Sequence, residues 1–169
     1  MSEYTRESEP VNIRKGSFEI VFPGDVEHVS ESDVGRVLGS TLARLKDNMG
    51  LSDEEFNERL FEETIDEALV NALKHGNRYD ARKKVIVAYE VSPDRITISV
   101  TDEGQGFTLE EVPDPTADKN LLKPSGRGVR SYMQFAFDEI TTSKTERGFI
   151  LTLTKRRKKA QIDKISNSV

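Results

Sequence analysis

The chain has 169 residues, of which 33% are charged, and its formal net charge is -5. This length suits one domain with a sizeable core. The acidic balance does not favour direct binding to nucleic acid or to an anionic membrane surface. The absence of cysteine excludes disulfides and thiolate metal sites. No apolar run approaches the ~20 residues of a membrane helix, and the polar N-terminus does not resemble a signal peptide. We therefore expect a cytoplasmic protein with no direct nucleic-acid or membrane contact.

The first part of the chain predicts a strand followed by a helix. Residues 1–14 are polar and charged, and we expect them to be disordered. A short strand is predicted at 17–22, before a Pro-Gly turn. A helix is predicted to begin between residues 29 and 33 and to end near Met49, because apolar residues recur at helical spacing and Gly50 is a good C-terminal stop.

A second, longer helix is predicted from Ser52 to about His75. Ser52 and Glu55 have the spacing of a capping box, and a buried apolar stripe continues through the following residues. Beside this stripe, polar residues recur at intervals of four and so share one helix face. These residues are Glu63, Glu67, Asn71 and His75. Such a row is either a solvated face or the wall of a site.

Further elements are predicted downstream: an antiparallel hairpin at 84–91 and 95–101, a long loop at 102–125, a helix after Gly128 to about Phe137, and strands at 139–143 and 149–154. A loop of this length usually serves as a lid or a binding loop. Aromatic residues at helical spacing, Tyr132, Phe135 and Phe137, are expected in the core. The basic run 155–159 is expected to be solvated.

The order of these elements predicts an α+β fold. We expect a two-layer sandwich, with helices packed on one face of a mixed, mostly antiparallel sheet. The folded domain is expected to span 15–155, followed by a basic and polar tail at 156–169.

Two short segments contain side chains suited to binding a nucleotide. Asn71 can supply an oxygen ligand to Mg²⁺, and Glu67, one turn earlier, can act as a general base. Asp102 follows a strand and can accept a hydrogen bond from an exocyclic amine, while Gly104 and Gly106 allow a ligand to approach the backbone closely. The alternatives are an ordinary polar helix edge and a plain turn.

A third segment, Ser125-Gly126-Arg127-Gly128, precedes a helix. Free backbone N–H groups and the helix dipole favour an anion at such a position. The alternative is a flexible hinge with a helix cap. The pattern differs from a P-loop because the G-x-x-x-x-G-K-[ST] spacing is absent.

In this order and on these elements, the three segments resemble the N, G1 and G2 boxes of the GHKL (Bergerat-fold) ATPases. The resemblance covers about 15–155 and includes a long ATP lid. Within that superfamily, EALVNALKHGN and PSGRGVRSYMQFAFDEI are similar to the anti-sigma-factor serine/threonine kinases of the RsbW and SpoIIAB type.

The resemblance implies a role for each matching residue. Glu67 is expected to be the general base toward a serine hydroxyl, Asn71 to bind Mg²⁺ between the ATP phosphates, and Asp102 to accept the adenine amino group. The other residues that it assigns to the nucleotide pocket are His75, Gly104, Gly106, Lys123, Ser125, Gly126, Arg127, Gly128 and Val129. His75 is expected in the wall of the pocket and not as a metal ligand.

The resemblance further implies a homodimeric ATP-dependent kinase that sequesters a sigma factor and phosphorylates a STAS-domain antagonist. Two departures from the family pattern bear on an alternative, a catalytically weak or inactive ATP/ADP-binding partner-switch module; Pro124 favours this alternative, whereas Glu67 favours the kinase. Pro124 replaces an Arg that reaches the γ-phosphate in some members, and Thr152 is displaced from the position where a Thr helps to hold adenine. A detached histidine-kinase catalytic domain is less favoured, because neither His28 nor His75 lies in a predicted phosphoacceptor helix.

Overall fold

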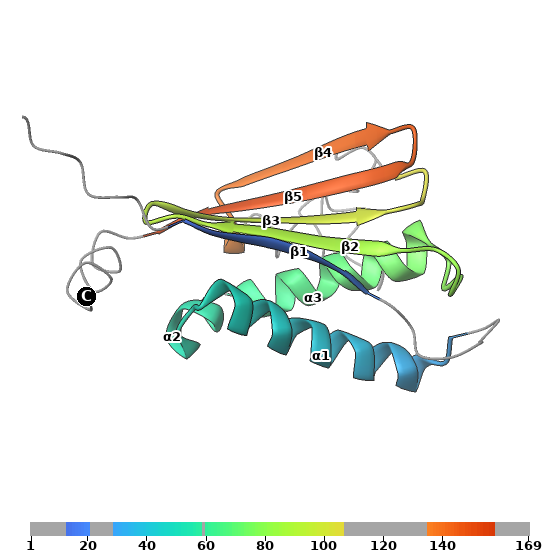
Figure 1. The fold of residues 1–169 in the computed structure, drawn as a ribbon, viewed down its shortest axis with the longest axis horizontal. Coiled ribbons are helices and arrows are strands. Elements are labelled where there is room, and N and C mark those ends of the chain that lie inside the picture. Colours follow the sequence, from blue (N-terminus) through green and yellow to red (C-terminus); the bar gives the residue numbers. More distant parts are fainter. Residues whose placement is uncertain (1–12, 21–28, 59, 107–134, 158–169) are drawn as a thin grey trace, which may run out of the picture.

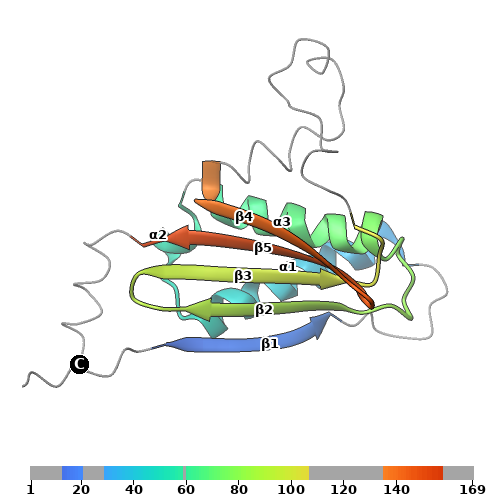
Figure 2. The same cartoon turned by 90° about the horizontal axis from the view of Figure 1, so that it is seen from above.

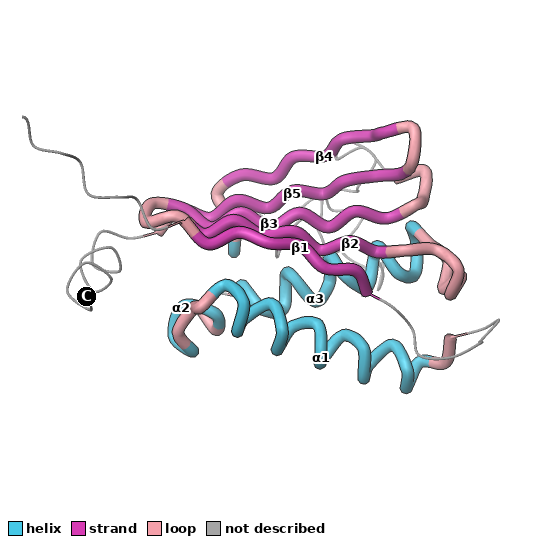
Figure 3. Tube along the Cα trace, viewed as in Figure 1, coloured by secondary structure: helices cyan, strands magenta, loops and turns pink. Residues whose placement is uncertain are grey.

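The computed structural model describes residues 13–20, 29–58, 60–106 and 135–157. Within these ranges a sheet forms one layer, and helices cover one of its faces (Figures 1 and 3). The elements are β1 (Arg14–Ile20), α1 (Glu31–Met49), α2 (Asp53–Phe56), α3 (Phe61–Asn71), the π-helical turn η1 (Ala72–Gly76), β2 (Val85–Val91), β3 (Arg95–Asp102), β4 (Glu139–Thr145) and β5 (Gly148–Arg156). No helix among them is long and apolar enough to cross a membrane.

The sheet has five strands in the order β1-β2-β3-β5-β4 (Figure 2). All four strand pairs among the described residues are antiparallel, so the predicted α+β sandwich is confirmed but its sheet is not mixed in this part of the chain. Both predicted hairpins are confirmed. β1 begins at Arg14, earlier than predicted and within the segment expected to be disordered.

The core lies between the sheet and the helices. Alternate residues of the central strands, such as Val87, Ile98 and Leu153, are fully buried against Leu45 of α1 and Leu69 of α3. Burying each of these side chains contributes about 1.5–3 kcal/mol. Period-two alternation places polar residues on the opposite face of the sheet, where cross-strand hydroxyl pairs connect β3 and β5.

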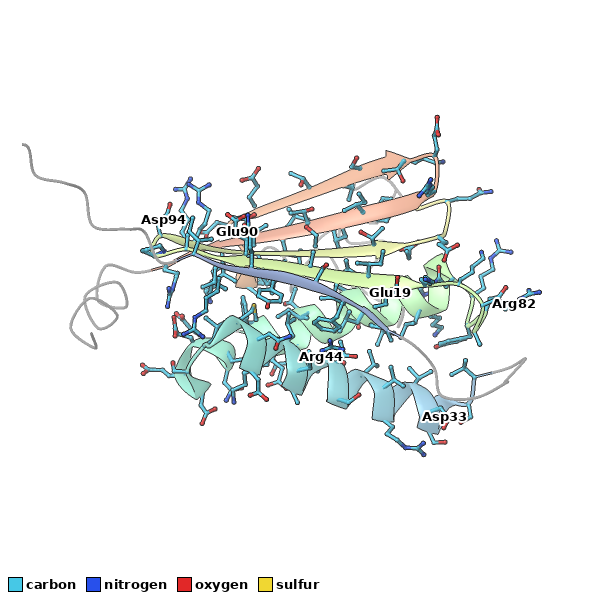
Figure 4. All side chains as sticks on the ribbon, viewed as in Figure 1. Glu19, Asp33, Arg44, Arg82, Glu90 and Asp94 are labelled. Carbon is cyan, nitrogen blue, oxygen red and sulfur yellow. The ribbon has the colours of Figure 1, made fainter. Side chains whose placement is uncertain are left out.

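Helix α1 has the ends predicted from the sequence. The side chain of Ser30 accepts a hydrogen bond from the backbone of Asp33, and Gly50 adopts a left-handed conformation that closes the last turn. Arg44 reaches from α1 toward the sheet, whereas Glu90 projects from the opposite face of the sheet (Figure 4). The guanidinium of Arg44 lies 4.3 Å from the centre of the Phe18 ring, which ties α1 to β1.

The predicted helix from residue 52 to 75 is wrong as a single element. Its capping box, Ser52 with Glu55, is confirmed, but α2 ends at Phe56. The chain then turns at Leu60, which has a φ of 63°, and α3 begins at Phe61. Residues five apart on one helix point in directions about 140° apart. The break instead lets Phe56 and Phe61 both enter the core, with their rings 5.8 Å apart.

The first residues of the basic run belong to the fold, and the expectation of a solvated run is wrong for Lys155 and Arg157, whereas Arg156 is exposed. β5 continues through Lys155 and Arg156, and alternate side chains face the helical layer. The Arg157 side chain is 5% exposed and forms an ion pair of 2.6 Å with Glu55. The ammonium of Lys155 lies 3.5 Å from Glu58. The end of the sheet is thereby attached to the α2 region.

The three aromatic residues expected in the core have different outcomes. Phe137 is buried and stacks on Phe61 at 5.0 Å, as predicted. Phe135 is 74% exposed, which contradicts the prediction. Phe135 and Phe137 are two positions apart in a helical turn, so their side chains point in different directions and only one of them can face the core. Tyr132 lies outside the described residues.

Candidate functional site

The first two predicted chemical segments meet at the C-terminal end of α3. Here the turn η1 packs against the end of β3. A Cβ atom added to Gly76 would overlap the carboxyl group of Asp102, and one added to Gly104 would lie 2.5 Å from the Cα of Gly76. Only glycine lets the two backbones approach so closely. The structure therefore brings together residues that are separated by a hairpin in the sequence.

Asp102 is the last residue of β3 and is 5% exposed. Burial raises the pKa of its carboxyl group, and the Gly104 amide and the positive charge of Lys83 oppose this shift. The Gly104 N–H donates to Oδ1 of Asp102 at 2.7 Å. Among the described residues, it is the one hydrogen-bond donor to this side chain. The second carboxylate oxygen accepts no hydrogen bond from the described residues.

Gly106 follows in the same segment and has a φ of 69°, a conformation that favours glycine. A Cβ atom at this position would overlap the ring of Phe149. Phe149 is buried and lies directly opposite Asp102 in the β3–β5 register. The ring thus shares the helix-facing side of the sheet with the carboxylate.

Thr152 lies on the other side of the sheet. It pairs with Ser99, and the two hydroxyl groups are 3.0 Å apart. Side chains alternate along a strand, so a residue three positions after Phe149 points away from Asp102. Thr152 therefore differs from the family's adenine-holding Thr in two respects, its position along the strand and the face of the sheet that it occupies. The Phe149 ring lies near the start of the strand, where that Thr was expected.

The polar row of α3 is only partly exposed. Glu63 is exposed, whereas Glu67 and Asn71 are half-buried. The carboxamide nitrogen of Asn71 is buried and has no hydrogen-bond partner among the described residues. An unpaired buried donor costs about 1–3 kcal/mol. A bound ligand or an ordered water would satisfy it, so Asn71 fits a residue at a binding site.

His75 does not continue this row. The Asn77 N–H donates to the Ala72 carbonyl at 2.8 Å, which makes η1 a π-helical turn with more residues than an α-helical turn. The wider turn rotates the residues after Asn71, so that His75 is exposed while Gly76 packs against Asp102. The predicted four-residue periodicity ends at Asn71. Such turns occur frequently at functional sites.

Asn77 directly follows η1 and was not among the residues predicted for the site. It is 2% exposed. Its Nδ2 donates to the Lys84 carbonyl at 3.0 Å, and its Oδ1 accepts from the Glu103 N–H at 2.8 Å. After it, Arg78 and Tyr79 have φ values of 54° and 57°, which are uncommon for residues other than glycine. No local signal in the sequence identifies these long-range bonds.

The remaining predicted pocket residues lie in 107–134, outside the described residues. They are Lys123, Ser125, Gly126, Arg127, Gly128 and Val129, together with Pro124. In the part of the chain that is described, no group of three His, Asp or Glu side chains could hold a metal ion. Mg²⁺ commonly takes one or two protein ligands with water and substrate phosphates, so Asn71 is compatible with such a site.

Comparison with known proteins identifies the family. Residues 23–155 match the family described as "Histidine kinase-like ATPase domain". The chain belongs to this family. Membership confirms the resemblance inferred from the three segments, and the sheet with helices on one face agrees with the predicted fold class.

Two curated relatives illustrate the similarity. The serine-protein kinase RsbW of Staphylococcus epidermidis is 26% identical over 151 residues, which cover 85% of this chain and 89% of the relative. The anti-sigma F factor of Bacillus subtilis (strain 168) is 31% identical over 99 residues, covering 57% and 68% respectively.

A solved structure, the histidine kinase domain from the Erythrobacter litoralis EL346 blue-light activated histidine kinase, aligns with a TM-score of 0.46 and 20% sequence identity. The alignment covers 79% of this chain and 65% of that chain, slightly less than two thirds of the solved protein.

Proposed function

We propose that the protein is an ATP-dependent serine/threonine protein kinase of the anti-sigma-factor type. The family is one of histidine kinase-like ATPase domains, and relatives carry the names serine-protein kinase and anti-sigma F factor. The observation that carries the proposal is the meeting of η1 with Asp102 directly after Asn71, whose buried amide lacks a described partner. In this proposal Asp102 would recognise the base and the Asn71 side-chain oxygen would ligate the metal, in adjoining parts of one site.

Asp102 would recognise adenine. Its free carboxylate oxygen would accept a hydrogen bond from the exocyclic amine, while Gly104 holds the other oxygen. Gly76 and Gly104 pack directly against this carboxyl group and would keep it in place. A buried charged acceptor strongly favours a base that donates at this position over one that presents a carbonyl oxygen.

Asn71 would hold Mg²⁺ together with the ATP phosphates. The metal would neutralise part of the phosphate charge. The segment 123–129 would contact the phosphates through Lys123, Arg127 and the backbone at the start of its helix. These contacts remain part of the proposal, since that segment lies outside the described residues.

Glu67 would act as the general base. It lies one helical turn before Asn71 and is half-buried, so a substrate hydroxyl near the phosphates would be within the same region. As the serine oxygen attacks the γ-phosphorus, its proton would pass to the Glu67 carboxylate and ADP would leave. Phosphoryl transfer depends mainly on positioning and charge stabilisation, which suits a site with a single base.

We further propose the partners that the anti-sigma-factor resemblance implies. The protein would be a homodimer that binds a sigma factor and releases it to bind an unphosphorylated STAS-domain antagonist. Phosphorylation of the antagonist would then restore binding to the sigma factor.

A second candidate is a nucleotide-dependent binding module that switches partners without transferring phosphate. One observation favours it. Pro124 occupies the position of an Arg that reaches the γ-phosphate in some relatives of this type.

Incubation with labelled Mg-ATP and candidate STAS-domain proteins separates the two candidates, with phosphoserine or phosphothreonine read by mass spectrometry. The kinase proposal expects labelled antagonist with the wild type and none with Glu67→Gln. Glu63→Gln, an exposed carboxylate one turn earlier, is the matched control and should retain transfer. Nucleotide binding without transfer to any STAS partner would favour the binding module.

A further inference from the structure

We propose that Asn77 is a positioning residue for recognition of the nucleobase. It fixes the Asp102 carboxylate at the place where it accepts the exocyclic amine of adenine. The inference rests on the proposed adenine role of Asp102 and extends it to a residue that would not touch the nucleotide.

The side chain of Asn77 joins three segments of the chain. Its Nδ2 donates to the carbonyl of Lys84, just before β2, and its Oδ1 accepts from the N–H of Glu103, just after β3. Its own N–H closes the π-helical turn on Ala72. The carboxylate of Glu103 in turn accepts from the Lys84 N–H at 2.6 Å. Residues 77, 84 and 103 are therefore connected in a closed ring of hydrogen bonds.

These bonds act on the residues next to the site. Asn77 follows Gly76, and Glu103 follows Asp102, so the bond between Asn77 and Glu103 sets the separation of Gly76 from Asp102. Gly76 and Asp102 cannot come closer together, because a single Cβ atom on Gly76 would already overlap the carboxyl group. The Gly104 N–H that orients Oδ1 comes from the next residue along the same segment.

Among the described residues, no other hydrogen bond joins the end of η1 to the segment after β3. The sheet ladder holds β3 through β2 and β5, but η1 lies outside the ladder. Arg78 and Tyr79, which follow Asn77, adopt left-handed conformations that persist only when the surrounding structure holds them. Loss of the Asn77 carboxamide would release the end of η1 from β3 and let the Asp102 carboxylate shift.

The test compares ATP with inosine triphosphate (ITP), which has a carbonyl oxygen in place of the exocyclic amine. Calorimetry on the full chain gives the ratio of the ITP dissociation constant to that of ATP. Wild type should favour ATP by at least about tenfold, since one charge-assisted hydrogen bond separates the two ligands. Asn77→Ala should reduce this ratio severalfold, toward one.

A core substitution far from the site supplies the control. Val91 is buried at the opposite end of β2 from Lys84, so Val91→Ala should lower the melting temperature and leave the ratio unchanged. A purely structural role for Asn77 would weaken both ligands equally and leave the ratio at its wild-type value. If Asn77→Ala does not fold, Asn77→Ser is measured in its place, because its shorter side chain keeps a polar group but cannot span the bonds to Lys84 and Glu103, and a reduced ratio is again expected.

The outcomes distinguish this inference from the proposed function. A wild-type ratio well above one that persists in the Asn77 variants overturns the inference alone. A wild-type ratio near one overturns it together with the adenine role of Asp102. A reduced ratio in the variants, with Val91→Ala unchanged, supports the positioning role.

Discussion

Replacing Asp102 by Asn should weaken nucleotide binding without weakening the fold. Asn has nearly the same shape, and its carbonyl oxygen can still accept from the Gly104 N–H. The amide nitrogen would then face the exocyclic amine, so two donors would oppose each other. Loss of a hydrogen bond to a charged group costs about 1.5–3 kcal/mol. The affinity for ATP should fall by about 10- to 150-fold.

The free energy of unfolding of Asp102→Asn should be higher than that of the wild type, or unchanged. Burial raises the pKa of the Asp102 carboxyl group, so the folded state holds its proton to a higher pH than the unfolded state. Stability therefore falls as the pH rises from the unfolded pKa through the folded one, and stays lower above it. Asn cannot titrate, so the variant should be at least as stable as the wild type at pH 7.5.

Asp66→Asn is the matched control. Asp66 lies on α3, and burial also raises the pKa of its carboxyl group. Its substitution should relieve a similar burial cost and leave ATP affinity unchanged. Calorimetric titration with a non-hydrolysable ATP analogue and thermal unfolding at pH 5 and 7.5 measure both effects. Unchanged affinity in Asp102→Asn, or a stability loss above about 1 kcal/mol, would refute the reasoning, since the carboxylate would then be a structural group.

Three further substitutions test other parts of the structure. Glu67→Gln should retain ATP binding and lose about 10²- to 10⁴-fold in transfer rate, and normal transfer in the labelling assay would remove it as the base. Asn71→Ala should weaken Mg-ATP by about tenfold while leaving stability unchanged or higher, because an unpaired buried amide is removed. If Mg-ATP affinity by calorimetry stays the same, Asn71 is not the metal ligand. Arg157→Ala should lower the free energy of unfolding by about 2–4 kcal/mol, because it removes the charged donor to Oε1 of the shielded Glu55 carboxylate. A change below 0.5 kcal/mol in denaturant unfolding would contradict that role.

Much of the architecture follows from local chemistry. The cap at Ser30, the stop at Gly50 and the capping box of Ser52 with Glu55 are properties of a few adjacent residues, and all are present. The same holds for the hairpin turn between β2 and β3. The three chemical segments were also recognisable, since each is short and contiguous, and they led to the family that the comparison confirms.

Tertiary structure decided the features that depend on distant partners. The break at Leu60 exists because Phe56 and Phe61 both enter the core, which periodicity within one helix cannot express. The register of β5 on β3, strands separated by about fifty residues, decides that Phe149 and not Thr152 lies beside Asp102. Burial of Arg157 likewise requires the α2 region as a partner.

The site shows the same division. The sequence by itself proposed Glu67, Asn71 and Asp102 as candidate site residues, because these side chains lie in short motifs with a recognisable chemistry. Only the tertiary structure revealed that a π-helical turn displaces His75 and that Asn77 bonds to segments on both sides of the β2–β3 hairpin. Hydrogen bonds between residues 77 and 103 depend on chain folding in space, and no local pattern of residues encodes them.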